Sequence, residues 1–231
     1  MQIDTSIRAR WYGPRLYKGK RYGVEAIIFH YTANTGSTAT ARSNANYFAT
    51  TDRQASAHYV VDSGETAYQC VPEEMASWAV GDGQSGEYGK KIGNHNSISI
   101  EMVSCTDAAG RFYIPERTQE RAAELYRELK KRYPQAFPLR HYDISRKPCP
   151  APMVDEAAWA EFKEVLDLTG EEIYRRLNEH LKTLDAPDWA QEELEQAKEL
   201  GITDGSKPMA LIPRYQAAIM CKRAVEAALK K

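Results

Sequence analysis

The chain has 231 residues and a formal net charge of −1, with 31 basic and 32 acidic side chains. This balance gives no electrostatic basis for binding nucleic acid or an anionic membrane, and no apolar stretch reaches the length of about 20 residues that a membrane-inserted helix needs. A chain of this length can form one substantial core and a small second unit.

Short apolar runs that are rich in β-branched residues predict the strands of a sheet. In the first of these runs, apolar residues occupy both alternating faces, which is typical of a strand that is covered on both sides. The predicted strands are Val24–Tyr31, His58–Asp62, Thr66–Val71, Ser97–Val103 and Leu139–His141.

Between the strands, apolar residues recur at helical spacing and predict amphipathic helices. Pro115 and Pro134 bracket the longest of them, where helix boundaries often fall. The predicted helices are Thr40–Thr50, Thr118–Tyr133 and Asp155–Leu166. Together these segments predict an α/β fold, with a central mixed β-sheet flanked by helices.

The composition changes after Leu168, and from there onward the sequence predicts helices alone. Residues 169–172, Thr-Gly-Glu-Glu, have a capping-box signature that opens the first helix. A second helix runs from near Asp188 to Gly201, and a third begins at Pro213 and ends near Lys230. We therefore predict two domains, residues 1–168 and a small all-helical C-terminal unit at residues 169–231.

Two histidines and a cysteine predict a metal site. His30 ends the first apolar strand, and His141 and Cys149 lie in one short run of sequence. Neutral imidazole and thiolate are good zinc ligands, and three protein ligands leave a fourth position for water. The alternative for each residue taken singly is a structural role, as a backbone-bonded histidine or a core side chain.

Two charged residues stand near these candidate ligands. Glu101 interrupts an apolar strand, and alternation places it with Ser97 and Ser99 on the face opposite Ile98, Ile100 and Met102. A carboxylate that faces a partly buried site suits a general base. Lys147 precedes Cys149 by two residues, so in an extended segment both side chains leave on the same side, where an ammonium could stabilise an oxyanion. The alternatives are a solvated edge-strand glutamate and a surface lysine.

Four ordered segments carry a family resemblance over roughly the first 165 residues. They are Phe29–Ala33, Ala55–Val61, Asn94–Met102 and Lys147–Pro150. With them the chain resembles the zinc-dependent N-acetylmuramoyl-L-alanine amidases, a group that includes phage lysins, peptidoglycan-recycling amidases and peptidoglycan recognition proteins. The resemblance implies the amidase fold and Zn²⁺ as cofactor.

The resemblance also implies roles for individual residues. It makes His30, His141 and Cys149 the zinc ligands, and it makes Glu101 and Lys147 the catalytic residues. The residues expected to contact the wall peptide are His58, Trp78 and Asn96. The chain departs from the pattern at Ala57, where other members have a catalytic tyrosine, and at Ala79, where many have a histidine that borders the substrate groove. These departures favour glutamate over tyrosine as the base.

The resemblance implies hydrolysis of the amide bond between N-acetylmuramic acid and L-alanine in peptidoglycan, in the setting of a phage or prophage endolysin. The N-terminus lacks a classical signal peptide, so we expect synthesis in the cytoplasm and action on the wall after release. The alternatives are a non-catalytic peptidoglycan-binding module and an intracellular muropeptide-recycling amidase.

The C-terminal helices offer a second, weaker resemblance. Residues 188–220 faintly resemble a single S-layer-homology repeat, which is a cell-wall-binding helix–turn–helix. The alternative is a helical addition that packs on the enzyme or forms a homo-oligomer.

The chain has four cysteines. If Cys149 binds a metal, three remain, which cannot all pair within one chain and which favour a reducing compartment. Cys70, Cys105 and Cys221 lie in or beside apolar patterns, and we predict that all three are buried thiols.

Overall fold

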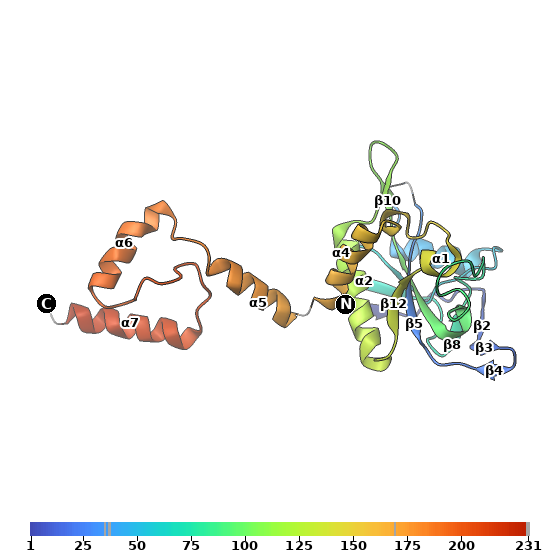
Figure 1. The fold of residues 1–231 in the computed structure, drawn as a ribbon, viewed down its shortest axis with the longest axis horizontal. Coiled ribbons are helices and arrows are strands. Elements are labelled where there is room, and N and C mark those ends of the chain that lie inside the picture. Colours follow the sequence, from blue (N-terminus) through green and yellow to red (C-terminus); the bar gives the residue numbers. More distant parts are fainter. Residues whose placement is uncertain (35, 37, 169, 230–231) are drawn as a thin grey trace. The chain divides into compact units, whose positions relative to one another are not determined.

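The computed structural model of the chain describes residues 1–34, 36, 38–168 and 170–229, with the backbone alone at 171–173 (Figure 1). By their internal contacts the residues group into two compact units, Met1–Asp167 and Leu168–Lys231. Within the described residues, no helix combines the length and the apolarity that crossing a bilayer requires.

Unit 1 is built on a six-stranded sheet with the strand order β1-β7-β6-β9-β5-β12. The strands are β1 (Gln2–Asp4), β5 (Ala26–Tyr31), β6 (Tyr59–Val61), β7 (Thr66–Gln69), β9 (Ser97–Met102) and β12 (Phe137–Arg140). The β6–β7 pair is antiparallel and every other neighbouring pair is parallel, so the sheet is mixed, as predicted.

Helices cover both faces of this sheet (Figure 1). Helices α2 (Glu116–Arg132) and α4 (Glu156–Asp167) pack on the face that carries Phe29 and Ile100. Helix α1 (Ala41–Thr50) packs on the opposite face, against Val60. The predicted α/β class is therefore confirmed. Strand β5 is buried at every residue except Tyr31 and has an apolar core on each of its sides, as its sequence indicated.

Local sequence explains where the helices begin and end. The side chain of Thr40 accepts a hydrogen bond from the Ser43 N–H, and the Ser43 side chain accepts one from the Thr40 N–H, which closes a capping box at the start of α1. Pro115 is the N-cap of α2 and Tyr133 is its C-cap, so Pro115 and Pro134 bracket this helix as predicted.

Several short elements were not predicted, because segments of two to four residues show no periodicity. They are β1 (Gln2–Asp4), β2 (Tyr12–Pro14), β3 (Leu16–Tyr17), β4 (Lys20–Arg21), β8 (Met75–Ser77), β10 (Cys105–Thr106), β11 (Phe112–Tyr113), α3 (Tyr142–Ser145) and the 3₁₀ turns Asn94–Asn96 and Ala151–Met153. Strand β2 pairs with β8, which lies about 60 residues later in the sequence. Tertiary structure therefore decides whether this pair forms.

The described residues of unit 2 form three helices, in agreement with the sequence. They are α5 (Gly170–Leu181), α6 (Asp188–Glu199) and α7 (Arg214–Ala228). The predicted cap at Thr169 and the predicted helix end at Lys230 lie outside the described residues. None of the side chains described between 168 and 229 is buried, and Ile219, Val225 and Leu229 are all exposed. Unit 2 therefore presents its apolar residues to its surroundings.

The prediction of three buried thiols is correct for one cysteine only. Cys70 is buried, but Cys105 is partly exposed and Cys221 is exposed. Cys221 lies on α7. Apolar spacing predicts that one face of this helix is apolar, but it does not show whether that face packs against a core, and here it is exposed. Cys105 lies in the short β10–β11 hairpin, outside the main sheet.

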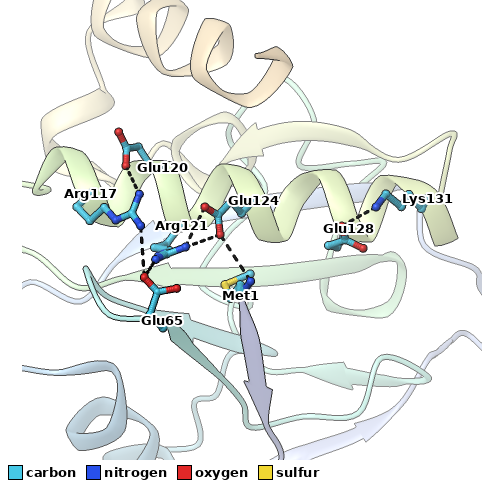
Figure 2. Close-up of polar contacts among 8 residues, drawn as sticks. All are labelled: Met1, Glu65, Arg117, Glu120, Arg121, Glu124, Glu128 and Lys131. Atoms are coloured by element: carbon cyan, nitrogen blue, oxygen red, sulfur yellow. Dashed lines mark hydrogen bonds and ion pairs between the residues drawn. The ribbon is translucent and has the colours of Figure 1, made fainter. Parts of the chain in front are cut away.

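An ion-pair network fastens α2 to the edge of the sheet (Figure 2). The guanidinium of Arg121, which is 4% exposed, pairs with Glu65 before β7 and with Glu124 one turn along the helix. The amino group of Met1 lies 4.0 Å from Glu124. Arg117 also contacts Glu65, but its side chain is 48% exposed.

We expect Arg121→Met to lower the free energy of unfolding. Its two carboxylate partners are reachable by water, so the loss should be about 1–2 kcal/mol, below the cost of breaking a fully buried pair. The matched variant Arg117→Met removes two solvated pairs, with Glu65 and Glu120, and should cost at most about 0.5 kcal/mol. Denaturant unfolding of both variants checks this, and equal losses would show that burial of Arg121 adds nothing.

Candidate active site

Pairing of two central strands places His30 beside Glu101. Strands β5 and β9 are parallel, and His30 is the register partner of Glu101. Paired residues of adjacent strands point to the same face of a sheet, so the two side chains leave the sheet together. Residues Ile98, Ile100 and Met102 enter the core on the other face, which confirms the alternation predicted for this strand.

A closed loop brings His141 and Cys149 to the same place. Strand β12 pairs with β5 and ends at Arg140, and the His141 N–H donates to the carbonyl of Phe29 (3.3 Å). The Tyr142 N–H donates to the carbonyl of Cys149 (2.9 Å), which closes the loop on itself. Both side chains are buried.

The three predicted metal ligands lie together. One ligand atom from each of His30, His141 and Cys149 lies within 4.8 Å of the others. The Sγ atom of Cys149 is 3.7 Å from His30 Nδ1, and the two imidazole centroids are 4.8 Å apart. Usual zinc bond lengths and a tetrahedral angle separate a sulfur and a nitrogen ligand by about 3.5 Å, so the spacing fits this ion.

Unsatisfied polar atoms mark the same place. His30 Nε2, His141 Nδ1 and Glu101 Oε2 are buried without a hydrogen-bond partner. Buried polar side chains normally have a partner, so the unpaired Nδ1 atom of His141 in this cluster indicates that a ligand completes it. The donor set of two imidazoles and one thiol is the kind that zinc prefers.

Burial controls the protonation of the three candidate ligands. It lowers the pKa of His30 well below the ordinary value, and the neighbouring His141 and Lys147 lower it further. Burial also lowers the pKa of His141, although Asp82 opposes this effect. Both imidazoles are therefore neutral at pH 7, which is the form that can bind a metal. Burial raises the pKa of Cys149 to about 12, so a metal has to displace the thiol proton.

The carboxyl group of Glu101 has a raised pKa. Burial raises the pKa of its carboxyl group to about 8, while the charge of Lys147 acts in the opposite direction. A carboxyl group that titrates near neutral pH can both accept and return a proton.

An open groove of about 400 Å³ adjoins the cluster. Lys147 and Asp82 line it together with Trp78, whose ring stacks on Trp11 at a centroid distance of 5.8 Å. The ammonium of Lys147 is 3.5 Å from Asp82 Oδ2. The structure therefore places Lys147 and Trp78 where a substrate can reach them.

Two other predicted site residues lie elsewhere. His58 is fully buried, and its Nδ1 atom accepts a hydrogen bond from the Ser99 N–H (3.0 Å) while Nε2 contacts the carbonyl of Met75 (3.0 Å). Burial and the charge of Arg15 lower the pKa of His58 to about 3. This neutral ring connects β9 of the main sheet to β8 of the small β2–β8 sheet, a placement that gives no support to the predicted contact with substrate.

Asn96 is buried in the 3₁₀ turn that precedes β9. Its Oδ1 atom accepts from the Gly93 N–H (2.9 Å), and its Nδ2 atom donates to the carbonyl of Lys91 (2.9 Å). The side chain is engaged in closing this turn, which likewise gives no support to a substrate contact.

Sequence reasoning missed two residues that shape the site. Arg140, the last residue of β12, is buried and bonds to the carboxylates of Asp143 and Glu156, and so holds the segment around His141. Asp82 Oδ1 lies 2.7 Å from His141 Nε2. Arg140 directly precedes the predicted ligand His141, and this position could have marked it as a site residue. Asp82 lies 59 residues from His141 in the sequence, so no local pattern indicates its role.

A family model for the N-acetylmuramoyl-L-alanine amidases matches residues 19–152, which is more than half of the chain. The chain belongs to this amidase family. The matched region includes the cluster of His30, His141 and Cys149 as well as Glu101 and Lys147. The family predicted from the four sequence motifs is thereby confirmed.

Curated amidases of bacilli are similar to this chain. The amidase CwlL of Bacillus licheniformis is 36% identical over 158 residues, which cover 64% of this chain and 42% of that protein. The amidase BlyA of Bacillus subtilis strain 168 is 33% identical over 156 residues, which cover 62% of this chain and 41% of that protein. The match therefore spans about two fifths of the length of these relatives.

Solved amidase structures have a similar fold. The catalytic domain of XlyA is 26% identical, with a TM-score of 0.54, and the match covers 72% of this chain and 99% of that domain. A mutant endolysin from Bacillus subtilis is 29% identical, with a TM-score of 0.53 and the same coverage of both chains.

Proposed function

We propose that this amidase-family chain hydrolyses the amide bond between N-acetylmuramic acid and L-alanine in peptidoglycan, with zinc as its cofactor. The observation that carries the proposal is the buried cluster of His30, His141 and Cys149, in which His141 Nδ1 lacks a hydrogen-bond partner. These three side chains would hold the ion.

When bound, zinc would polarise the amide carbonyl and make water acidic enough to attack near neutral pH. Glu101 stands on the strand beside His30, where its carboxylate accepts the proton of the attacking water. It then returns this proton to the nitrogen of the leaving L-alanine. Lys147, at the edge of the groove, places an ammonium where it stabilises the oxyanion of the tetrahedral intermediate.

The test is to digest purified cell walls and to identify the products by mass spectrometry. An amidase releases intact glycan strands and peptides with a free N-terminal L-alanine. Zinc analysis should find one equivalent per chain, and a chelator should remove metal and activity together. Wall binding without release of peptides would identify a non-catalytic module instead.

We also propose the setting of a phage or prophage endolysin that acts on the wall after release. The similarity to an endolysin from Bacillus subtilis supports this setting. An enzyme of this kind should act on polymeric walls, whereas a muropeptide-recycling amidase should prefer small soluble muropeptides. The ratio of the two rates distinguishes these settings.

Unit 2 suits an accessory role in which it holds the chain on its polymer. Its apolar side chains are exposed, including Trp189 at 79%, and they need a surface to contact. The candidate surfaces are the cell wall and a second copy of the chain. All the proposed catalytic residues lie in unit 1.

We expect truncation after Leu168 to leave a folded unit 1 that retains zinc. Activity on a soluble muropeptide should survive, while activity on intact walls should fall if unit 2 tethers the enzyme, because tethering raises the effective substrate concentration. Light scattering on both forms provides the control. An unchanged mass with reduced wall binding supports an anchor, a fall from dimer to monomer supports self-association, and insoluble protein would contradict the domain boundary.

A further inference from the structure

The loop that carries Asp82 is fastened to the segment that carries His141. The Gly86 N–H donates to the carbonyl of Ile144 (2.8 Å), and the Tyr88 N–H donates to that of Asp143 (2.9 Å). A Cβ atom at Gly86 would collide with the Asp143 carbonyl, so only glycine permits the backbone at residue 86 to lie this close to the backbone at residue 143. Asp82 is therefore held beside His141 by the fold around it.

The contact between Asp82 and His141 fixes the tautomer of the imidazole. Asp82 Oδ1 is 2.7 Å from His141 Nε2, and a carboxylate can only accept a hydrogen bond, so Nε2 carries the hydrogen. The lone pair of the ring is then on Nδ1, the buried atom without a partner. This is the nitrogen that can bind a metal.

The second oxygen of the same carboxylate faces Lys147. Asp82 Oδ2 is 3.5 Å from Lys147 Nζ, and both residues line the groove beside the cluster. One exposed side chain thus contacts a predicted metal ligand and a predicted oxyanion-stabilising group at the same time.

We propose that Asp82 is a positioning residue, which orients His141 for metal binding through Nδ1 and holds Lys147 at the mouth of the site. The proposal rests on the zinc-dependent function proposed above. Metal-binding histidines commonly donate their other ring N–H to a carboxylate, and loss of such a partner costs about 10–100-fold in metal affinity or activity.

The test is the zinc affinity of the full chain, measured by competition with a chromogenic chelator. Asp82→Ala should weaken zinc binding by about 10–100-fold. Asp82→Asn should fall between this variant and the unaltered chain, because its amide oxygen can still accept from Nε2. Glu87→Ala, which alters an exposed acidic residue of the same loop, is the matched control and should bind zinc as the unaltered chain does.

Two further measurements separate positioning from general stability. Lys147→Met leaves the contact between Asp82 and His141 in place and should keep its zinc affinity. In the cobalt-substituted protein, Asp82→Ala should change the ligand-field spectrum, which reports the geometry at the metal, while the thermal unfolding of the metal-free chain stays unchanged.

The outcomes distinguish the two proposals. Zinc affinity and a cobalt spectrum in Asp82→Ala equal to those of the unaltered chain would overturn the role of Asp82 alone. Failure of the unaltered chain to bind one equivalent of zinc would overturn the proposed function and this role with it.

Discussion

Replacing Cys149 by serine should remove zinc from the chain and abolish amide hydrolysis. A hydroxyl is a far poorer zinc ligand than a thiolate, and the remaining pair of histidines would have to hold the ion alone. Burial already disfavours the charged form of the side chain at this position, so a serine hydroxyl would stay protonated there.

The measurement is metal content after dialysis, together with turnover on purified walls. Cys221→Ser is the matched control, because it makes the same chemical change at an exposed cysteine of unit 2 and should leave zinc content intact. Full zinc occupancy with normal turnover in Cys149→Ser would remove Cys149 from the site.

Replacing Glu101 by glutamine should leave zinc bound and lower turnover by about 10²–10⁴-fold, the range for loss of a general base. Glutamine keeps the shape of the side chain but cannot accept the proton. Because an uncharged amide relieves the cost of burying a carboxylate, the variant should be at least as stable as the unaltered chain.

Turnover, zinc content and thermal unfolding measured on one preparation separate the possible roles. The matched control is Glu87→Gln, an exposed glutamate to which turnover should be insensitive. Zinc loss in Glu101→Gln would make Glu101 a ligand, and a normal rate would make it a bystander.

The sequence predicted those parts of the fold that local patterns determine. Strand β5 carries a continuous apolar run, β9 alternates apolar with polar residues, and α2 carries a long apolar stripe between two prolines, so their positions followed from periodicity. The short pair of β2 and β8 could not be predicted, because three-residue strands have no period and form only where tertiary structure brings them together.

The candidate site was predicted to a similar extent. The cluster of His30, His141 and Cys149 followed from ligand chemistry and family motifs, and the structure brings these residues together. The roles of Asp82 and Arg140 depend on contacts that only the folded chain creates. The burial of His58 was missed because a histidine in a β-strand has the same pattern whether it faces a groove or a neighbouring strand.

The register between β5 and β9 has a consequence for how this protein should lose activity on heating. The backbone hydrogen bonds that hold His30 opposite Glu101 belong to the centre of the sheet, so a slip of one residue would exchange Glu101 for the apolar Ile100. The pairing of β5 with β9 therefore either holds His30 beside Glu101 or separates them completely. Heat should therefore separate His30 from Glu101 only when the sheet itself melts. Any loss of activity below that temperature should come from the segment that carries His141, Lys147 and Cys149.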